Sequence, residues 1–501
     1  MKTSGLGKFA LGQTVPNRDH AVCVSLPTVD DLIGYEEKRP DTLQSLQSGY
    51  PRFVKHPFLR KLIDREEKQN EGFHYFLISN SWHCEEAIKR FSIQDYTVRE
   101  RDGYTCLQIP NKSNAIAQTN SFLQHTGGVI SSRHAEDILL KKGHFLKREN
   151  ISSHENPFEF AQEIIAEVHG TGVTKDGVLF TSSGANAFYS LFRTAYLHLL
   201  KRGKNLWIRL GWLYLDTNET MNLLANEDEI ITITDPTDFD ELRKVFKEFG
   251  SKIAGLVTEF PTNPLLQSCN LEQVRELCDQ VDAMLIIDPT MASHKNSKVA
   301  ELGDVLVNSL TKYASWEGDV MIGSLVFPEH SQKGQELFNE TAKTISPPFE
   351  RDLLRLCEQL PLYPSFVKET NRSLIQVVDF LESNNLVQKV FWAYQENSYK
   401  NFTQRAGDGK PGCVVSFEVK GDFEKFYNQL SMLKSPSFGT EFSICCPYVY
   451  LAHYNLTKSK KGQQTLENAG ISPQLCRVSV GLENPDEIKK TLQIALQGMI
   501  K

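Results

Sequence analysis

Short apolar runs and amphipathic stretches alternate along the middle of the chain. The apolar runs predict strands at residues 177–180, 205–209, 229–234, 252–259, 284–288 and 305–309. The intervening segments have the apolar spacing of helices, at residues 157–168, 187–202, 238–249 and 271–281. Strands that alternate with helices predict an α/β fold with a mostly parallel sheet covered on both faces. Ligands of such sheets bind at the carboxyl ends of the strands.

The two flanking regions have different patterns. Residues 74–79, 84–91 and 106–109 follow the order strand, helix, strand, which predicts a small β-α-β unit. After Pro328 long helices and scattered strands predict an α+β domain. We therefore divide the chain into an N-terminal extension with a small α/β segment, a large ligand-binding domain and a C-terminal α+β domain, at residues 1–150, 151–350 and 351–501.

Composition narrows the class of protein. Of 501 residues, 40% are hydrophobic and 23% charged, as in globular proteins that are soluble. The formal net charge of −7 offers no basic field that would recruit nucleic acid or an anionic membrane. The ten cysteines include no CxxC pair, so we expect reduced, buried cysteines in a cytoplasmic protein. The thirteen histidines show no spacing typical of metal ligands.

No targeting segment is expected either. No apolar stretch approaches the roughly 20 residues that a membrane-spanning helix needs. The N-terminal residues MKTSGLGKFALGQT show no convincing secretory cleavage site.

Lys312 is the main candidate for a catalytic residue. It follows the apolar run at 304–307 and the residues Asn308-Ser309-Leu310-Thr311. A lysine held and partly desolvated at a strand end can act as a Schiff-base nucleophile. Neighbouring hydroxyls and backbone N–H groups can hold a phosphate. The alternative for this segment alone is a surface lysine in a turn.

Other polar residues also follow predicted strands. Thr181–Asn186 is a glycine-containing turn before a helix, which suits an anion. Asp288 ends the run MLIID and is either a helix cap or a partner for a buried cation such as a pyridinium nitrogen. Asn263 lies in a loop fixed by two prolines, where it either binds a ligand or shapes a turn.

Two further side chains complete the set. Tyr214 either stacks on a flat ring or packs in the core. Arg477 interrupts an apolar strand and needs a carboxylate, from either the protein or a substrate. Together, an anion site, an acid for a ring nitrogen, a stacking aromatic, a lysine and an arginine complement pyridoxal 5'-phosphate (PLP) with an amino-acid substrate.

These segments resemble one enzyme family. Thr181–Ala187, Tyr214, TEFPTNP, IIDPT, NSLTKY and RVSVGLENPDE occur in the order seen in the Cys/Met-metabolism PLP enzymes of cystathionine gamma-synthase type. HAVCVSLPT, GYEE, GYPRF, LQHTGGVISSR and CPYVYLAHY resemble the fungal type, which has a long N-terminal extension. The resemblance implies PLP fold type I, like aspartate aminotransferase, with a seven-stranded sheet in the large domain.

The resemblance also implies roles for single residues. Lys312 binds PLP covalently and moves protons between substrate carbons, and Asp288 pairs with the ring nitrogen. Tyr214 stacks on the ring and takes part in catalysis. Asn263 faces the ring hydroxyl, while Arg477 and Ser437 bind the substrate carboxylate. The residues expected to hold the cofactor's phosphate are Gly184, Ala185, Ser309 and Thr311, and Ser183 and Thr290 are further expected cofactor-binding residues.

The sequence departs from the family pattern in three places. The family's Tyr-x-Arg-x-x-Asn-Pro segment is reduced to Asn156-Pro157, so we consider Arg133 a substitute phosphate ligand. Leu215-Asp216 follows Tyr214 where two glycines are usual. Trp316–Asp319 replaces the usual Gly-His-Ser-Asp.

The activity implied by the resemblance is a γ-replacement. An O-acylated homoserine would react with cysteine to give cystathionine, which is trans-sulfuration in methionine biosynthesis. The alternatives are a γ- or β-lyase, an O-acylhomoserine sulfhydrylase and a non-catalytic relative. The resemblance also implies small amino-acid substrates and a homodimer or homotetramer.

Overall fold

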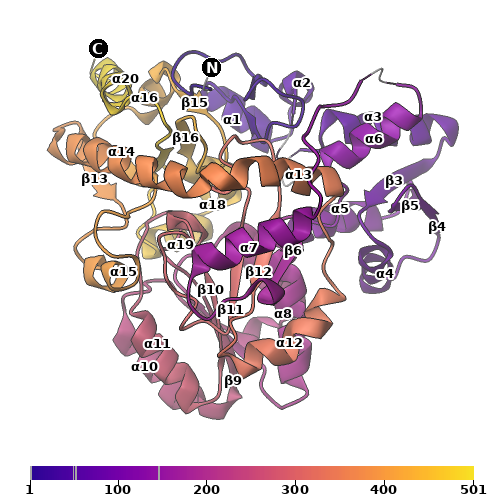
Figure 1. Ribbon diagram of the computed structural model, residues 1–501. Helices are drawn as coiled ribbons and strands as arrows, with labels where there is room; N and C mark the ends of the chain where they lie inside the picture. The colour runs from indigo at the N-terminus through magenta and orange to yellow at the C-terminus, as the bar shows by residue number, and fades with distance from the viewer. Residues whose placement is uncertain (1–2, 49, 51–53, 145–146, 501) are drawn as a thin grey trace.

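A seven-stranded sheet lies at the centre of the computed structural model, which describes residues 3–48, 50, 54–144 and 147–500 (Figure 1). The strand order is β6-β12-β11-β10-β9-β7-β8. The strands are β6 (Val178–Thr181), β7 (Leu206–Leu210), β8 (Ile230–Ile233), β9 (Ile253–Glu259), β10 (Met284–Asp288), β11 (Val305–Ser309) and β12 (Gly323–Val326). Only β12 is antiparallel to its neighbours, so the predicted, mostly parallel sheet is confirmed.

Helices cover both faces of this sheet. One apolar layer packs the sheet against α7 (Pro157–His169), α10 (Phe239–Phe249) and α11 (Leu271–Gln280). The other layer packs it against α8 (Gly184–Leu200), α9 (Leu215–Leu224) and α12 (Gln332–Ala342). The sequence pattern missed α9 and α12, because α9 in particular is mostly polar and has weak apolar spacing.

The register of the sheet brings polar residues together at one edge. Asp288 at the end of β10 pairs with Glu259 at the end of β9. Ser309 at the end of β11 pairs with Gly323, which in turn pairs with Thr181 of β6. The carboxyl ends of β9, β10, β11 and β6 therefore meet in one row, as expected for a ligand site.

A second, smaller sheet follows the N-terminal segment. It has the order β3-β5-β4, formed by β3 (Phe73–Ile78), β4 (Thr97–Arg101) and β5 (Tyr104–Pro110), and all pairs are antiparallel. Around it lie α3 (Pro57–Gln69), α4 (Ser81–Arg90), α5 (Ala115–Thr126) and α6 (Ser132–Lys141). The prediction of a simple β-α-β unit missed β4, whose residues TVRER are mostly exposed and lack an apolar face.

The C-terminal region contains a third sheet, in the order β13-β14-β17-β16-β15. Its strands are β13 (Val387–Phe391), β14 (Val414–Val419), β15 (Leu433–Lys434), β16 (Ile444–Pro447) and β17 (Cys476–Ser479). The helices of this region include α13 (Glu350–Gln359), α14 (Tyr363–Ser383), α16 (Phe423–Gln429) and α20 (Pro485–Gly498). The predicted α+β character is confirmed, and the central strand β17 carries Arg477.

Residues 3–48 pack against this distant C-terminal sheet (Figure 1). They form the two-stranded ribbon β1 (Thr14–Val15) and β2 (Cys23–Val24), then α1 (Val29–Glu36) and α2 (Pro40–Ser45). Backbone bonds join Gly7 N to Ser431 O at 2.9 Å and Leu26 N to Lys434 O at 2.9 Å. The N-terminal segment is thus held beside the chain that leads to Ser437.

The cysteines are as predicted: all ten are free and buried. Within the described ranges, no helix combines the length and apolar character needed to cross a membrane.

Candidate active site

A cavity of about 450 Å³ opens at the carboxyl ends of the large sheet. The predicted site residues that line it are Ser183, Gly184, Ala185, Tyr214, Asn263, Asp288, Thr290, Ser309, Lys312 and Arg133. Thr311 is buried and does not line this cavity. Arg477 and Ser437 are also outside the lining, but they contact residues that belong to it.

Lys312 stands just after β11, with its side chain held in the cavity wall. Only 7% of the residue is exposed. The Nζ atom donates to Ser437 Oγ at 2.9 Å and to Tyr50 Oη at 3.3 Å. The rings of Tyr50 and Phe438 lie 4.8 Å and 5.4 Å from Nζ. The surface-lysine alternative is therefore wrong, because the amine is buried and fixed by specific contacts.

Ser437 connects Lys312 to Arg477. Its hydroxyl accepts from Lys312, and its carbonyl accepts from Arg477 Nη2 at 3.1 Å. The backbone φ of Ser437 is +94°, a region that residues other than glycine rarely adopt. Such a conformation persists where the surroundings enforce it. Here it directs one residue's hydroxyl and carbonyl toward the two cationic side chains.

Asp288 and Glu259 supply two neighbouring acids at the ends of β10 and β9. Thr290 N donates to Asp288 Oδ1 at 2.8 Å, and burial raises the pKa of Asp288 to about 6. Burial and the charge of Asp288 raise the pKa of Glu259 well above its usual value. A pyridinium nitrogen beside Asp288 would return this carboxyl to its ionised form by charge pairing.

The opposite end of the site suits an anion. Helix α8 begins at Gly184, and its first N–H groups have no partner within the helix. The N-cap Ser183 and the hydroxyl-bearing Ser309 border the same cavity. A Cβ atom at Gly184 would come within 2.9 Å of Ser309 Cβ, so glycine permits this close approach. The geometry agrees with a phosphate at a helix N-terminus.

Thr290 and Glu259 organise the remaining backbone. Thr290 Oγ1 accepts from Ser309 N at 3.0 Å and so joins the ends of β10 and β11. Glu259 accepts from Tyr214 N at 2.5 Å and from Asn263 N at 3.1 Å. Glu259 is a site residue that the sequence analysis did not select, because a glutamate at a strand end carries no spacing signal.

Arg133 has a different environment from the one predicted. Its Nε donates to Glu149 at 2.6 Å, and Nη1 donates to Asp352 Oδ1 at 3.0 Å and to the Asp319 carbonyl at 2.8 Å. Its Nη2 also contacts Glu149, at 3.2 Å. The geometry therefore argues against Arg133 as a phosphate ligand, because every guanidinium nitrogen already has an oxygen partner.

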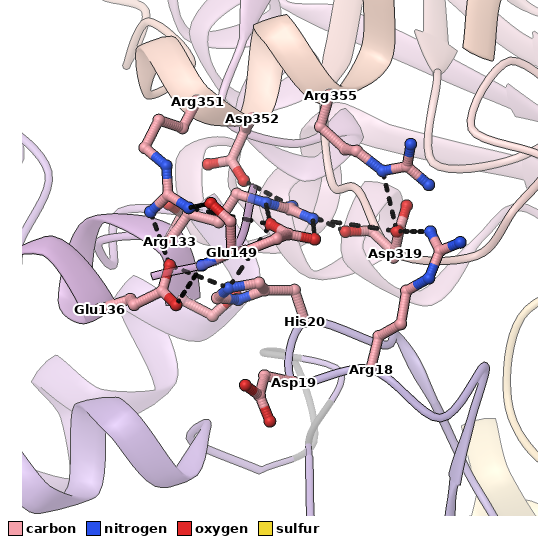
Figure 2. A network of polar contacts seen from close by, with 12 residues as sticks. Arg18, Asp19, His20, Arg133, Glu136, Glu149, Asp319, Arg351, Asp352 and Arg355 are labelled. Atoms are coloured by element: carbon pink, nitrogen blue, oxygen red, sulfur yellow. Dashed lines mark hydrogen bonds and ion pairs between the residues drawn. The ribbon is translucent and has the colours of Figure 1, made fainter. Parts of the chain in front are cut away.

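This arginine belongs to a buried ionic network at the cavity wall (Figure 2). Asp319 lies among three arginines, with Arg18 at 2.6 Å, Arg355 at 3.0 Å and Arg133 at 4.0 Å. Burial alone would raise the pKa of Asp319, but these arginines hold it below its usual value. The network joins the N-terminal segment, the loop after Lys312 and α13.

The network explains one departure from the family pattern. Glu317 pairs with Arg18 at 2.8 Å and with Arg355 at 2.5 Å. Trp316 Nε1 donates to Gln359 O at 3.0 Å. The residues 316–319 are thus adapted to α13 and to an N-terminal segment that carries Arg18.

A second departure also has a partner. Asp216, two residues after Tyr214 where a glycine is usual, is hydrogen-bonded through Oδ1 to His125 Nδ1 at 2.9 Å. Asp216 is buried and lines the cavity beside Tyr214. This contact ties α9 to the end of α5.

The family comparison agrees with the site. Residues 109–497 match the model of the family described as Cys/Met metabolism PLP-dependent enzyme. The chain belongs to this family. Its cofactor is PLP, and its relatives include several cystathionine gamma-synthases.

Two of the curated relatives match this chain over nearly its whole length. The L-2-amino-4-chloropent-4-enoate dechlorinase/desaturase of Streptantibioticus cattleyicolor is 30% identical, over 98% of this chain and 99% of its own. The cystathionine gamma-synthase of Saccharomyces cerevisiae is 23% identical, over 97% of this chain and 98% of its own. The cystathionine gamma-synthase of Neurospora crassa is 26% identical, over 63% of this chain and 51% of its own.

Solved structures support the fold. The cystathionine gamma synthase of Xanthomonas oryzae pv. oryzae, in complex with aminoacrylate and cysteine, has a TM-score of 0.59 and 22% identity, over 69% of this chain and 87% of its own. The cystathionine gamma-lyase of Lactobacillus plantarum, complexed with L-serine, has a TM-score of 0.58 and 19% identity, over 71% of this chain and 92% of its own. The predicted PLP fold type I is confirmed.

Proposed function

We propose that this chain catalyses PLP-dependent γ-elimination on an α-amino acid that carries a leaving group at its γ-carbon. The observation that carries this proposal is the shared cavity in which the Lys312 amine faces Ser437, with Asp288 and the N-terminus of α8 in the same wall. The γ-leaving group is common to the gamma-synthase relatives and to the dechlorinase/desaturase.

The residues present match what PLP requires. Lys312 would hold the cofactor covalently, Asp288 would pair with its ring nitrogen, and Tyr214 would cover the ring. Ser183, Gly184, Ala185 and Ser309 would hold the phosphate end, with Thr290 fixing Ser309 N. Bound PLP supplies an electron sink for the charge left on a substrate carbon after proton removal.

The protein's own groups then handle the substrate and its protons. Arg477 would bind the α-carboxylate and orient the amino acid, with Asn263 and Ser437 fixing the guanidinium. Lys312, once released from the cofactor, would take the α-proton and return protons to the substrate. The buried Asp288 would keep the cofactor's ring nitrogen protonated. The loss of one proton and one γ-substituent leaves a more unsaturated amino-acid skeleton.

The dechlorinase/desaturase, which matches this chain over nearly its whole length, favours elimination over replacement. A dechlorinase/desaturase, by its name, removes a halogen and adds unsaturation rather than adding a thiol. Its match is also the most complete among the relatives described above, at 30% identity over both chains. γ-Replacement of an acylated homoserine by cysteine is the second candidate, supported by the gamma-synthases of two fungi. A homodimer or homotetramer is the oligomer we expect for either reaction.

Product analysis separates the two candidates. The PLP-loaded protein is incubated with O-acetyl- or O-succinyl-homoserine, with and without cysteine, and the products are identified by mass. The unsaturated amino acid left by elimination tautomerises to an imine, and water hydrolyses it to 2-oxobutanoate and ammonia, so 2-oxobutanoate in both mixtures supports elimination. Cystathionine that forms only with cysteine would replace our proposal with γ-replacement. Absence of both products, together with intact amino acid after incubation with a γ-chloro substrate, would contradict both candidates.

A further inference from the structure

The N-terminal extension forms part of the cavity wall. Among the described residues up to Tyr50, those that line the cavity are His20, Ala21, Val22 and Tyr50. Of these, Tyr50 touches the reactive amine, with its hydroxyl 3.3 Å from Lys312 Nζ. The Tyr50 ring centroid lies 4.8 Å from the same atom. The contact joins residues of one chain that are 262 positions apart.

Tyr50 is anchored on both sides. Ser48 is fully buried and donates its hydroxyl to Ala21 O at 2.5 Å. On the other side, Val54 N donates to Tyr50 O at 3.1 Å. The Ser48 bond holds the chain two residues before Tyr50 against Ala21 of the segment that lines the cavity.

The same segment is also attached to the loop that follows Lys312. Val22 N donates to Gly318 O at 2.9 Å. Arg18 forms ion pairs with Glu317 and Asp319, and Figure 2 shows Arg18 pointing to Asp319 beside Arg355. The extension therefore contacts Lys312 and the loop that follows it at several points, through Arg18, Val22 and Tyr50.

The chemistry of a phenol suits both forms of the amine. When Lys312 is an ammonium, the Tyr50 oxygen accepts a hydrogen bond from it, and the face of the Tyr50 ring attracts its positive charge. When Lys312 is a neutral amine, the Tyr50 hydroxyl can donate to it. Ser437 provides a second partner at 2.9 Å. Two fixed partners define the direction of the amine while it takes and returns a proton.

We propose that Tyr50 is a positioning residue for Lys312, supplied by the N-terminal extension of the same chain. The hydroxyl orients the amine for proton transfer, and the ring covers it. The kinetic part of this inference rests on the function proposed above. The contact itself exists without turnover, so a test on the cofactor-free protein separates the two.

The first test measures the reactivity of Lys312 without cofactor. The purified cofactor-free protein is treated with acetic anhydride, and modification of the Lys312 peptide is followed by mass. Tyr50→Phe keeps the ring and removes the hydroxyl, while Tyr35→Phe makes the same change in α1 of the extension. Loss of a hydrogen bond of ordinary strength predicts roughly three- to tenfold faster modification in Tyr50→Phe, and the wild-type rate in Tyr35→Phe. Equal rates in all three proteins would overturn the proposal.

The second test measures turnover of the PLP-loaded protein. In Tyr50→Phe we expect kcat to fall about tenfold or more with KM within about twofold, because an interaction with the proton-transfer group is lost. A change in KM alone would overturn a positioning role. If modification rates respond as expected but no γ-elimination is found, the Tyr50–Lys312 relationship stands and the proposed function fails.

A third test asks whether Tyr50 acts within its own chain. Lys312→Ala and Tyr50→Phe chains are co-expressed, and the mixed preparation is compared with each variant alone. With Tyr50 acting in the same chain, no mixed assembly has an intact site, and activity does not exceed that of Tyr50→Phe. Restored activity would show that Tyr50 serves a neighbouring subunit and would overturn the same-chain assignment.

Discussion

Arg477 Nη1 donates to Asn263 Oδ1 at 2.8 Å, which joins the central strand of the C-terminal sheet to the loop after β9. The two residues come from distant parts of the chain and are both buried. The Arg477 guanidinium lies 5.0 Å from the Phe438 ring and 5.6 Å from the Tyr448 ring. It is therefore fixed in orientation beside the cavity before any substrate binds.

Arg477→Lys should weaken binding of the amino-acid substrate. A lysine cannot reproduce the planar pair of donors that holds a carboxylate and Asn263 together. Loss of a charged hydrogen bond predicts a rise in KM of about tenfold or more. The amount of PLP that borohydride reduction fixes to Lys312 should stay unchanged. Steady-state kinetics test this, with Arg405→Lys as the control, because Arg405 pairs with Glu272 away from the cavity. An unchanged KM would assign Arg477 a purely structural role.

Lys312→Ala should abolish covalent attachment of PLP and turnover. After borohydride reduction of the wild type, we expect the cofactor mass on the peptide that contains Lys312. The alanine variant should show no such label and lose essentially all activity, because no amine remains to attack the cofactor or to carry protons. Lys343→Ala, on the exposed end of α12, is the control. A label on another lysine of an active Lys312→Ala protein would contradict the assignment.

Asp288→Asn should change how stability depends on pH in the cofactor-free protein. The pKa of Asp288 is raised from 3.8 to about 6 because the folded protein buries its charge. Below about pH 4, the carboxyl is protonated in both the folded and the unfolded state, and its burial then costs no ionisation energy. As pH rises through about 6, the unfolded chain ionises more readily than the folded protein, so the free energy of unfolding falls.

Asparagine does not ionise, so the variant should avoid this loss. We expect the free energy of unfolding of Asp288→Asn, relative to wild type, to increase between pH 5 and pH 8 by about 1.4 kcal/mol, because about half of the whole effect already lies below pH 5. Glu259 adds to the effect, because the charge of Asp288 also raises the Glu259 pKa. Urea unfolding at the two pH values measures the difference. A difference that is the same at both pH values would show that Asp288 is ionised in the cofactor-free fold.

Asp319→Ala should destabilise the protein strongly. The carboxylate is buried among Arg18, Arg133 and Arg355, and its removal leaves buried positive charges with fewer partners. Breaking such a network by removing one member typically costs about 3–5 kcal/mol. Asp30→Ala is the control, because Asp30 forms an exposed pair with Arg39 and should cost at most about 1 kcal/mol. Equal urea midpoints for the two variants would contradict the importance of the network.

Much of the site followed from local sequence signals. Lys312, Asp288 and the turn before α8 each follow an apolar strand, and these strands, β11, β10 and β6, run in the same direction, so the three features meet in one cavity. Asn263 and Tyr214 lie in the same lining for the same reason. The positions of the large-sheet strands and of most helices along the chain were predicted from apolar spacing.

The remainder depends on long-range packing that has no local signal. Tyr50 lies in no helix or strand, and only the folded path of the extension brings it to Lys312. Arg133 was expected to bind phosphate in place of the family's missing Tyr-x-Arg segment, but its oxygen partners belong to Glu149, Asp319 and Asp352. The β4 strand and the α9 helix carry polar sequences, so their formation depends on tertiary contacts.

Release of the γ-substituent tests the central claim most directly. The PLP-loaded wild type and Lys312→Ala are incubated with L-2-amino-4-chloropent-4-enoate without any thiol, and chloride is measured against loss of the amino acid. We predict that the wild type releases one chloride for each substrate consumed and that Lys312→Ala releases none above the rate in buffer. Intact substrate with the wild type, or equal chloride release by both proteins, would contradict γ-elimination at this site.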